Sequence, residues 1–251
     1  MAISEQALRN RERWDALADG YQQQHGPQLT VDELVWGQWS IPDAEVGVLG
    51  DVAGRTVLEL GCGGAQWSVA LAKRGACVIG LDNSARQLQH ARELVATAGV
   101  EVQLVHASAE SVPLPDGSFD IVLSDHGALS WGEPGRVVPE IARLLRRGGL
   151  LAFNVTSPLV RMCWNDENDS LDTALHRSYF DVYRTEEGEG AATFALRHGE
   201  WIRLLRDSAF EVEGLVELRP RTEASTTYGD FVPLDWARRW PAEDLWKARR
   251  R

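Results

Sequence analysis

A glycine-rich turn flanked by two acidic residues is the part of this 251-residue sequence best suited to bind a small ligand. Residues 57–65 read VLELGCGGA, with Glu59 two positions before Gly61, and Asp82 follows Gly61 by 21 positions at the end of the next apolar stretch. Glycines at the end of a first parallel strand let a ligand approach the backbone without a Cβ in the way, and the helix that follows offers free N–H groups. An acid at the end of the second strand can accept hydrogen bonds from ribose hydroxyls.

Glu59 discriminates between the nucleotide classes that such a turn could bind. A carboxylate there would repel the pyrophosphate of a dinucleotide, whereas it would attract a sulfonium or an ammonium group. The glycine spacing is also G-x-G rather than G-x-G-x-x-G, because Gln66 occupies the last position of the longer pattern. The turn therefore favours a cationic nucleoside ligand over a nicotinamide dinucleotide.

These residues require strands and helices that bring them to one edge of a sheet. Short apolar stretches predict strands, and amphipathic stretches between them predict helices. The strands are expected at 56–60, 77–81, 102–106, 119–124 and 150–155, and the helices at 66–74, 84–98 and 133–145. This alternation predicts a doubly wound α/β fold with a parallel sheet covered on both faces. Ligands of such a sheet bind beyond the carboxyl ends of the strands.

The flanking segments complete this plan. A helix at 5–21 and a second short helical stretch at 31–38 predict an N-terminal helical lid over residues 1–53. Residues 54–156 form the expected cofactor-binding core, and the polar, acidic and aromatic stretch 157–198 is expected to be a cap insertion over the active site. A helix at 200–209 and strands at 210–218 and 245–249 predict that residues 199–251 complete the sheet.

Three motifs in this order resemble the class I S-adenosylmethionine-dependent methyltransferases, in particular bacterial enzymes acting on small molecules. They are the stretch 57–82, the run PLPDGSFD at 113–120 and the run LLRRGGL at 144–150. The resemblance covers about residues 54–155. It implies a Rossmann-like, seven-stranded, mostly parallel sheet with helices on both faces, and S-adenosyl-L-methionine as the cofactor.

The resemblance also implies roles for individual residues. The methionine moiety would lie against Glu59, Gly61 and Gly63, and the ribose against Asp82. The remaining cofactor contacts would come from Tyr21, Asn83, Gln87, Ser108, Ala109, Glu110 and Ser124. Tyr21 would cover the cofactor, although it could equally belong to the core. Two departures from the family pattern are Ala65 in place of a third glycine and Ser108 in place of an aspartate. The second departure leaves the adenine amino group to Glu110 or to a backbone carbonyl.

His126 is the candidate catalytic residue, because it follows the fourth strand with Ser124 and Asp125 and would face the sulfonium and the acceptor. An imidazole titrates near neutrality and could deprotonate a hydroxyl or an amine; it could also hydrogen-bond a ligand without moving a proton. Five aromatic residues of the flanking segments could line an aromatic substrate pocket or pack those segments on the core: Trp36, Trp39, Trp164, Tyr179 and Tyr183.

The expected reaction is methyl transfer by in-line displacement to an O, N, S or C nucleophile of a small, partly aromatic molecule, with S-adenosylhomocysteine as product. The cofactor is already activated, so alignment and exclusion of water are the main requirements. The alternatives are a nicotinamide-dependent oxidoreductase and a non-catalytic module that binds S-adenosylmethionine. A macromolecular methyltransferase is disfavoured, since the run SDHG at 124–127 stands where an Asn/Asp-Pro-Pro-Tyr run would be.

Composition limits the partners. The formal net charge of -11 argues against nucleic acid and anionic membranes as partners, because both favour a basic surface. The three cysteines are odd in number and irregular in spacing, which fits neither a disulfide framework nor a zinc site, and no other cluster predicts a metal. The first residues lack the apolar stretch of a signal peptide, and no apolar run could span a membrane, so a cytoplasmic location is expected. A homodimer is compatible with the sequence.

Overall fold

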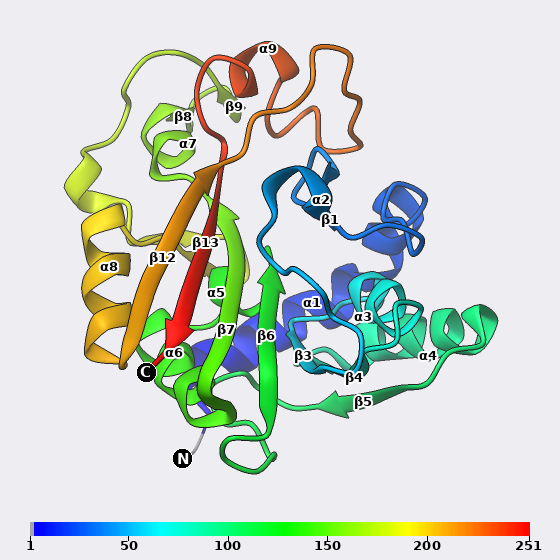
Figure 1. Ribbon diagram of the computed structural model, residues 1–251. Coiled ribbons are helices and arrows are strands. Elements are labelled where there is room, and N and C mark those ends of the chain that lie inside the picture. Colours follow the sequence, from blue (N-terminus) through cyan, green and yellow to red (C-terminus); the bar gives the residue numbers. More distant parts are fainter. Residues whose placement is uncertain (1–2) are drawn as a thin grey trace.

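The computed structural model describes residues 3–251, which form a seven-stranded, mostly parallel sheet with helices on both faces (Figure 1). The strand order is β12-β13-β7-β6-β3-β4-β5, and β13 runs antiparallel to both of its neighbours. The strands are β3 (Thr56–Leu60), β4 (Cys77–Asp82), β5 (Val102–His106), β6 (Phe119–Asp125), β7 (Leu145–Thr156), β12 (Phe210–Glu217) and β13 (Glu243–Arg250). The predicted doubly wound α/β fold is confirmed.

The remaining elements surround this sheet. The helices are α1 (Glu5–His25), α2 (Asp43–Val46), α3 (Gln66–Ala72), α4 (Ala85–Ala98), α5 (Ala128–Trp131), α6 (Pro134–Leu144), α7 (Pro158–Cys163), η1 (Tyr179–Asp181), α8 (His198–Asp207) and α9 (Leu234–Ala237). Short strand pairs are β1 (Val35–Trp36) with β2 (Ile41–Pro42), β8 (Trp164–Asn165) with β9 (Ser170–Leu171), and β10 (Arg184–Glu186) with β11 (Ala192–Phe194). No helix among residues 3–251 is long and apolar enough to cross a membrane.

Successive residues of the central strands supply two separate hydrophobic cores. Val57 of β3 packs with Leu71 of α3 on one face, whereas Leu58 packs with Ile141 of α6 on the other. All four side chains are fully buried, and each such burial stabilises the fold by about 1.5–3 kcal/mol. Both faces of the sheet are therefore covered, which explains why the strands are apolar throughout rather than alternating.

The carboxyl ends of β3 and β6 meet where the strand order reverses. Gly61, directly after β3, has a φ of 74°, and a Cβ there would lie 2.5 Å from the backbone nitrogen of Ala128. Only glycine tolerates both the left-handed backbone and this close contact. Gly61 therefore allows the turn after β3 to pack directly against the turn after β6, and this places the two turns on one site.

The C-terminal strand is longer than its predicted range of 245–249. It begins at Glu243, which is opposite Thr156 in the antiparallel register with β7. Because β13 runs against β7, the first residue of β13 lies at the carboxyl edge of the sheet, beside the predicted ligand site. The apolar pattern that predicted the strand did not include this acidic residue.

The prediction of a short helix at 31–38 is wrong. Val35 and Trp36 form a strand that pairs with Ile41–Pro42, and Gly37 ends it with a φ of 72°. The spacing of Trp36 and Trp39 resembled one face of a helix, but the fully buried Trp36 is held instead by a 2.8 Å hydrogen bond from its Nε1 to Asp43. Tertiary contacts override local helix propensity in this segment.

The segment 157–198 contains α7, η1 and the pairs β8–β9 and β10–β11, and its part around β11 is attached to α1. The Asn10 side chain donates a 2.8 Å hydrogen bond to the carbonyl oxygen of Ala192 and accepts one of 2.9 Å from its N–H group. Gln6 donates to the carbonyl oxygen of Gly190 in the same region. These contacts join the segment to the N-terminal helix rather than to the turn after β3.

Candidate active site

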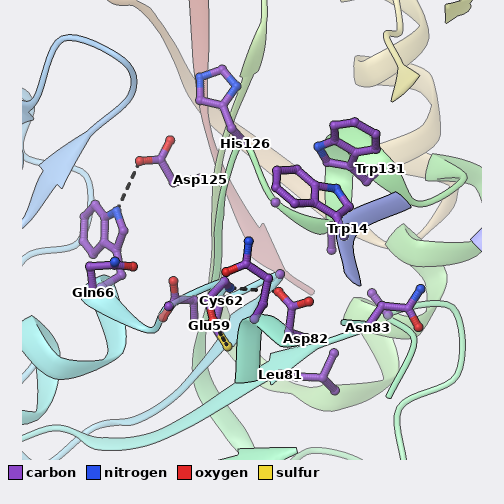
Figure 2. Close-up of a pocket in the computed structure, with 18 of the residues that line it drawn as sticks. Trp14, Glu59, Cys62, Gln66, Leu81, Asp82, Asn83, Asp125, His126 and Trp131 are labelled. Atoms are coloured by element: carbon purple, nitrogen blue, oxygen red, sulfur yellow. Dashed lines mark hydrogen bonds between the residues drawn. The ribbon is translucent and has the colours of Figure 1, made fainter. Parts of the chain in front are cut away.

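A cavity opens at the carboxyl ends of β3, β4 and β6, between these strand ends and the segment that runs from α1 to β1 (Figure 2). Ten of the twelve predicted site residues line it: Tyr21, Glu59, Gly61, Gly63, Asp82, Asn83, Gln87, Ser108, Ala109 and His126. Residues 157–198, the expected cap, contribute none of its described lining. The wall opposite the strand ends is formed instead by the N-terminal segment, for example by Trp14 and Val35.

Asp82 anchors one end of the cavity. Its Oδ2 accepts a 2.8 Å hydrogen bond from the N–H of Gly63, and its Oδ1 accepts one of 2.8 Å from the N–H of Ser84. Burial raises the pKa of Asp82, and these two backbone hydrogen bonds offset only part of that rise. A carboxylate can accept about four hydrogen bonds, so Asp82 retains acceptor capacity for a pair of ligand hydroxyls.

The neighbouring polar side chains attach α1 to this end of the cavity. Asn83 donates to the carbonyl oxygen of Ala7 at 2.7 Å and accepts from Arg11 at 2.9 Å. Gln87 accepts a 2.8 Å hydrogen bond from Gln22 of α1. Asn83 and Gln87 therefore line the cavity and also hold the helix that closes it.

Glu59 is a buried acid with one oxygen available to the cavity. Its Oε2 accepts two hydrogen bonds from Ser68, of 2.8 Å from the N–H group and 2.5 Å from the hydroxyl. Its Oε1 has no hydrogen-bond partner among the described residues, although the residue is only 5% exposed. Burial raises the pKa of Glu59 to about 8, because it outweighs the hydrogen bonds from Ser68. A cation placed in the cavity would relieve this cost by stabilising the carboxylate.

Glu110 and Ser124 lie outside the cavity. Glu110 accepts hydrogen bonds of 2.9 Å from both the N–H and the hydroxyl of Ser4, the residue that caps α1. The fully buried Ser124 donates a 2.9 Å hydrogen bond to the carbonyl oxygen of Leu60, which ties β6 to β3. In this structure both residues hold neighbouring elements in place instead of facing a ligand.

Aromatic residues that the sequence did not single out line the cavity. Trp14 of α1 and Trp131 of α5 meet edge to face with ring centroids 5.0 Å apart, above Asp82 in Figure 2. Trp14 lies one heptad before Tyr21 on the same face of α1, and this spacing could have identified it. Trp131 follows β6 in a helix of four residues that apolar periodicity does not detect.

The aromatic residues expected from the flanking segments are placed elsewhere. Trp36 and Trp39 are buried in the core, and Trp164 packs against Phe231. None of the five, including Tyr179 and Tyr183, is among the described lining of the cavity. Of the two roles left open, the structure supports packing for Trp36, Trp39 and Trp164, whereas Tyr183 is exposed.

The far end of the cavity holds a hydrogen-bonded group of four polar side chains. His126 contacts the Oε1 of Glu243 through Nε2 at 2.5 Å, and Asn154 donates to Asp125 at 2.9 Å and to Glu243 at 3.1 Å. Asp125 also accepts a 3.2 Å hydrogen bond from Trp67. In Figure 2, Asp125 and His126 lie above Glu59, on the side away from Asp82. Sequence reasoning missed Asn154 and Glu243.

His126 is basic and conformationally strained. Burial lowers the pKa of His126, but the hydrogen bond and the charge of Glu243, together with the charge of Asp125, outweigh burial and raise the pKa above its ordinary value. The backbone φ of His126 is 49°, in the left-handed region that non-glycine residues rarely adopt. Such strain costs on the order of 1–3 kcal/mol and is concentrated at functional sites.

The central part of the chain matches a known family. Residues 58–153 match the family model described as a methyltransferase domain. This range contains the turn after β3, Asp82 and the end of β6, which together form the cavity floor. Residues 58–153 therefore form a methyltransferase domain.

Individual methyltransferases show how far the similarity extends. The chain is 38% identical over 108 residues to a demethylmenaquinone methyltransferase of Listeria monocytogenes, covering 41% of this chain and 46% of that protein. The chain therefore spans less than half the length of that curated relative.

Among solved structures, an S-adenosylmethionine-dependent methyltransferase from Mesorhizobium loti superposes with a TM-score of 0.66 at 24% identity, covering 82% of this chain and 96% of the other. The [4+2]-cyclase SpnF superposes with the same TM-score at 18% identity, covering 100% and 98% of the two chains. At these identities the two structures show that the fold is shared, and they do not show which reaction this chain catalyses.

Proposed function

We propose that the chain transfers a methyl group from S-adenosyl-L-methionine to an O, N, S or C nucleophile of a small molecule, with S-adenosylhomocysteine as product. The observation that carries the proposal is the cavity with the free oxygen of Glu59 and the carboxylate of Asp82, joined by the glycine turn between them. When bound, the cofactor supplies a methyl group already activated on a sulfonium.

The residues present fit such a cofactor. Glu59 would hold the ammonium of the methionine moiety, and Asp82 would accept from the ribose hydroxyls. The glycine turn offers its backbone to the ligand, because Gly61, Gly63 and Gly64 line the cavity and carry no Cβ. Ser108 and Ala109 line the part of the cavity next to Asp82 and would contact the adenine. Tyr21 would cover the cofactor from α1.

The protein's contribution to the reaction is alignment and exclusion of water. The strand ends hold the cofactor site rigidly, and α1 closes it through Asn83 and Gln87. His126 lies beyond the methionine end of the site and would accept the proton of the attacking group. Positioning two reactants in this way can lower a barrier by about 7–11 kcal/mol.

The cavity lining favours a small acceptor with an aromatic part. Four aromatic residues line the cavity, namely Trp14, Tyr21, Trp67 and Trp131, and its described lining contains neither lysine nor arginine. The lining also contains the acids Glu33, Glu59, Asp82 and Asp125, so a neutral or cationic acceptor is favoured over an anionic one. The name of the demethylmenaquinone methyltransferase relative also supports a small ring-containing acceptor.

The proposal is tested by incubating the protein with S-adenosyl-L-methionine labelled in its methyl group and a panel of small phenols, alcohols, amines and thiols. Labelled product and S-adenosylhomocysteine should appear in equal amounts with at least one acceptor. Asp82→Ala should strongly reduce this transfer at low cofactor concentration, whereas Glu167→Gln, outside the described cavity lining, should not. Cofactor binding without any acceptor-dependent transfer would favour a non-catalytic module or a different reaction on the same fold, for which the [4+2]-cyclase SpnF is a precedent.

A further inference from the structure

The hydrogen bonds around His126 determine which of its ring nitrogens carries a proton. The Asn154 amide nitrogen has two hydrogens, and its contacts at 2.9 Å to Asp125 and 3.1 Å to Glu243 use both. No hydrogen of the Asn154 amide is therefore left for the 3.2 Å contact with Nε2 of His126, which is not a hydrogen bond donated by Asn154. The opposite orientation of the amide is unfavourable, because it would point the amide oxygen at two carboxylates. Nε2 must itself donate to Glu243, which leaves the lone pair on Nδ1.

Glu243 is held as an acceptor by two other donors. Its Oε1 accepts a 2.9 Å hydrogen bond from the N–H of Gln38 as well as the bond from Asn154. Its side chain is 2% exposed, whereas that of His126 is 24% exposed and lines the cavity. Nδ1 of His126 has no partner among the described residues, so it is the ring nitrogen available to a ligand.

The register of β13 separates two acid–histidine pairs onto opposite faces of the sheet. Glu243 faces His126 and the cavity, and the next residue, Asp244, accepts a 2.8 Å hydrogen bond from His198 of α8. Both acids are about 1% exposed. His198 does not line the cavity, so its pair provides an internal comparison with the same chemistry and a different location.

We propose that Glu243 is a positioning residue that holds His126 in its Nε2–H form, with Nδ1 poised to remove a proton from the methyl acceptor. This inference rests on the proposed methyl transfer and narrows the acceptor to molecules with a removable proton on the attacking atom, such as a hydroxyl, a phenol or an ammonium.

The step balances without a further reactant. The lone pair of the acceptor atom forms the new bond to the methyl carbon, and the carbon–sulfur bond breaks with its electrons going to sulfur. The acceptor's proton moves to Nδ1, and the resulting imidazolium is stabilised by the Glu243 carboxylate. The proton then passes to water when the product leaves. Besides Glu243, the charged groups that act on this imidazole are Asp125 and, with the opposite sign, Arg161 of α7.

Nuclear magnetic resonance of protein labelled with ¹⁵N at histidine tests the assignment directly. In the wild type we expect the neutral form of His126 to carry its proton on Nε2 and to titrate above 6.5. Glu243→Gln keeps an oxygen for Nε2–H but removes the charge, so the titration midpoint of His126 should fall by about one pH unit or more. An Nδ1–H form in the wild type, or an unchanged midpoint in Glu243→Gln, would overturn the proposal.

Asp244→Asn is the matched control on the same strand. It should lower the titration midpoint of His198 and leave that of His126 unchanged, which separates a local charge effect from damage to β13. In the methyl-transfer assay, Glu243→Gln should move the acidic limb of the pH profile by the same amount as the His126 midpoint. S-adenosylhomocysteine binding, measured on the same samples, reports separately on the proposed function. Loss of binding with the expected Nε2–H form would contradict the function alone.

Discussion

Replacing Glu59 by glutamine should stabilise the unliganded protein while weakening its cofactor. The folded protein raises the pKa of Glu59 from 4.5 to about 8 through burial. Between these values the unfolded chain ionises the carboxyl and the folded protein keeps it neutral, so the wild type loses stability as the pH rises. At pH 7 the interval of 2.5 pH units corresponds to about 3 kcal/mol. Glutamine keeps an oxygen for the two hydrogen bonds from Ser68 and carries no such cost.

Urea unfolding followed by circular dichroism measures this effect. Wild type and Glu59→Gln should have similar stabilities near pH 4, and the variant should become more stable by about 3 kcal/mol at pH 7, with the difference levelling off above pH 8. Glu140→Gln is a control of opposite sign. Burial raises the pKa of Glu140, but hydrogen bonds from Arg143 and Val112 lower it overall, so this variant should be less stable than wild type at pH 7.

Glu59→Gln should also weaken S-adenosylhomocysteine binding about tenfold or more, because a hydrogen bond to a charged group contributes about 1.5–3 kcal/mol. Adenosine lacks the amino acid moiety, so its affinity should not change. A stability difference that does not depend on pH, or an equal loss of affinity for both ligands, would refute the placement of Glu59 against a ligand ammonium.

Three further substitutions test other parts of the site. Asp82→Ala should weaken both S-adenosylhomocysteine and adenosine by on the order of 1–3 kcal/mol in calorimetry, and an unchanged affinity would remove the ribose assignment. His126→Ala should reduce turnover by about 10² or more at nearly normal cofactor affinity, and full activity would exclude a base at this position. Gly61→Ala should lower the free energy of unfolding in urea by more than about 2 kcal/mol, because its Cβ would meet the backbone of Ala128. Gly47 has a similar φ and open space around it, so Gly47→Ala should lower this free energy by only about 1 kcal/mol. Equal losses of stability in the two variants would contradict the close packing at Gly61.

The cofactor end of the site was predictable because its determinants are local. Glu59, Gly61 and Gly63 follow one another in a single turn, and Asp82 ends the strand that pairs with β3. Apolar strand patterns locate these ends, and the topology of a parallel sheet brings them together. Ser124 was misplaced because residues at a strand end alternate between the faces of the sheet, and its side chain points toward Leu60 instead of the cavity.

The acceptor end depends on contacts between distant parts of the chain. His126 and Glu243 are 117 residues apart, and they meet only because β13 inserts antiparallel between β7 and β12 with one particular register. A shift of one residue would bring Asp244 to the cavity face instead. Trp131 lies in a helix too short for periodicity to reveal. The segment at 31–38 was misread because two tryptophans three positions apart also fit a short strand, with Trp36, followed by a turn that begins at Gly37 and contains Trp39.

Isothermal titration calorimetry with S-adenosylhomocysteine, compared with NAD⁺ under the same conditions, tests the central claim most directly. The free carboxyl oxygen of Glu59 and the glycine turn predict saturable binding of S-adenosylhomocysteine with one site per chain, weakened in Asp82→Ala, and no heat of binding with NAD⁺. Saturable binding of NAD⁺ with none of S-adenosylhomocysteine would contradict the assignment of this cavity to a methyl donor.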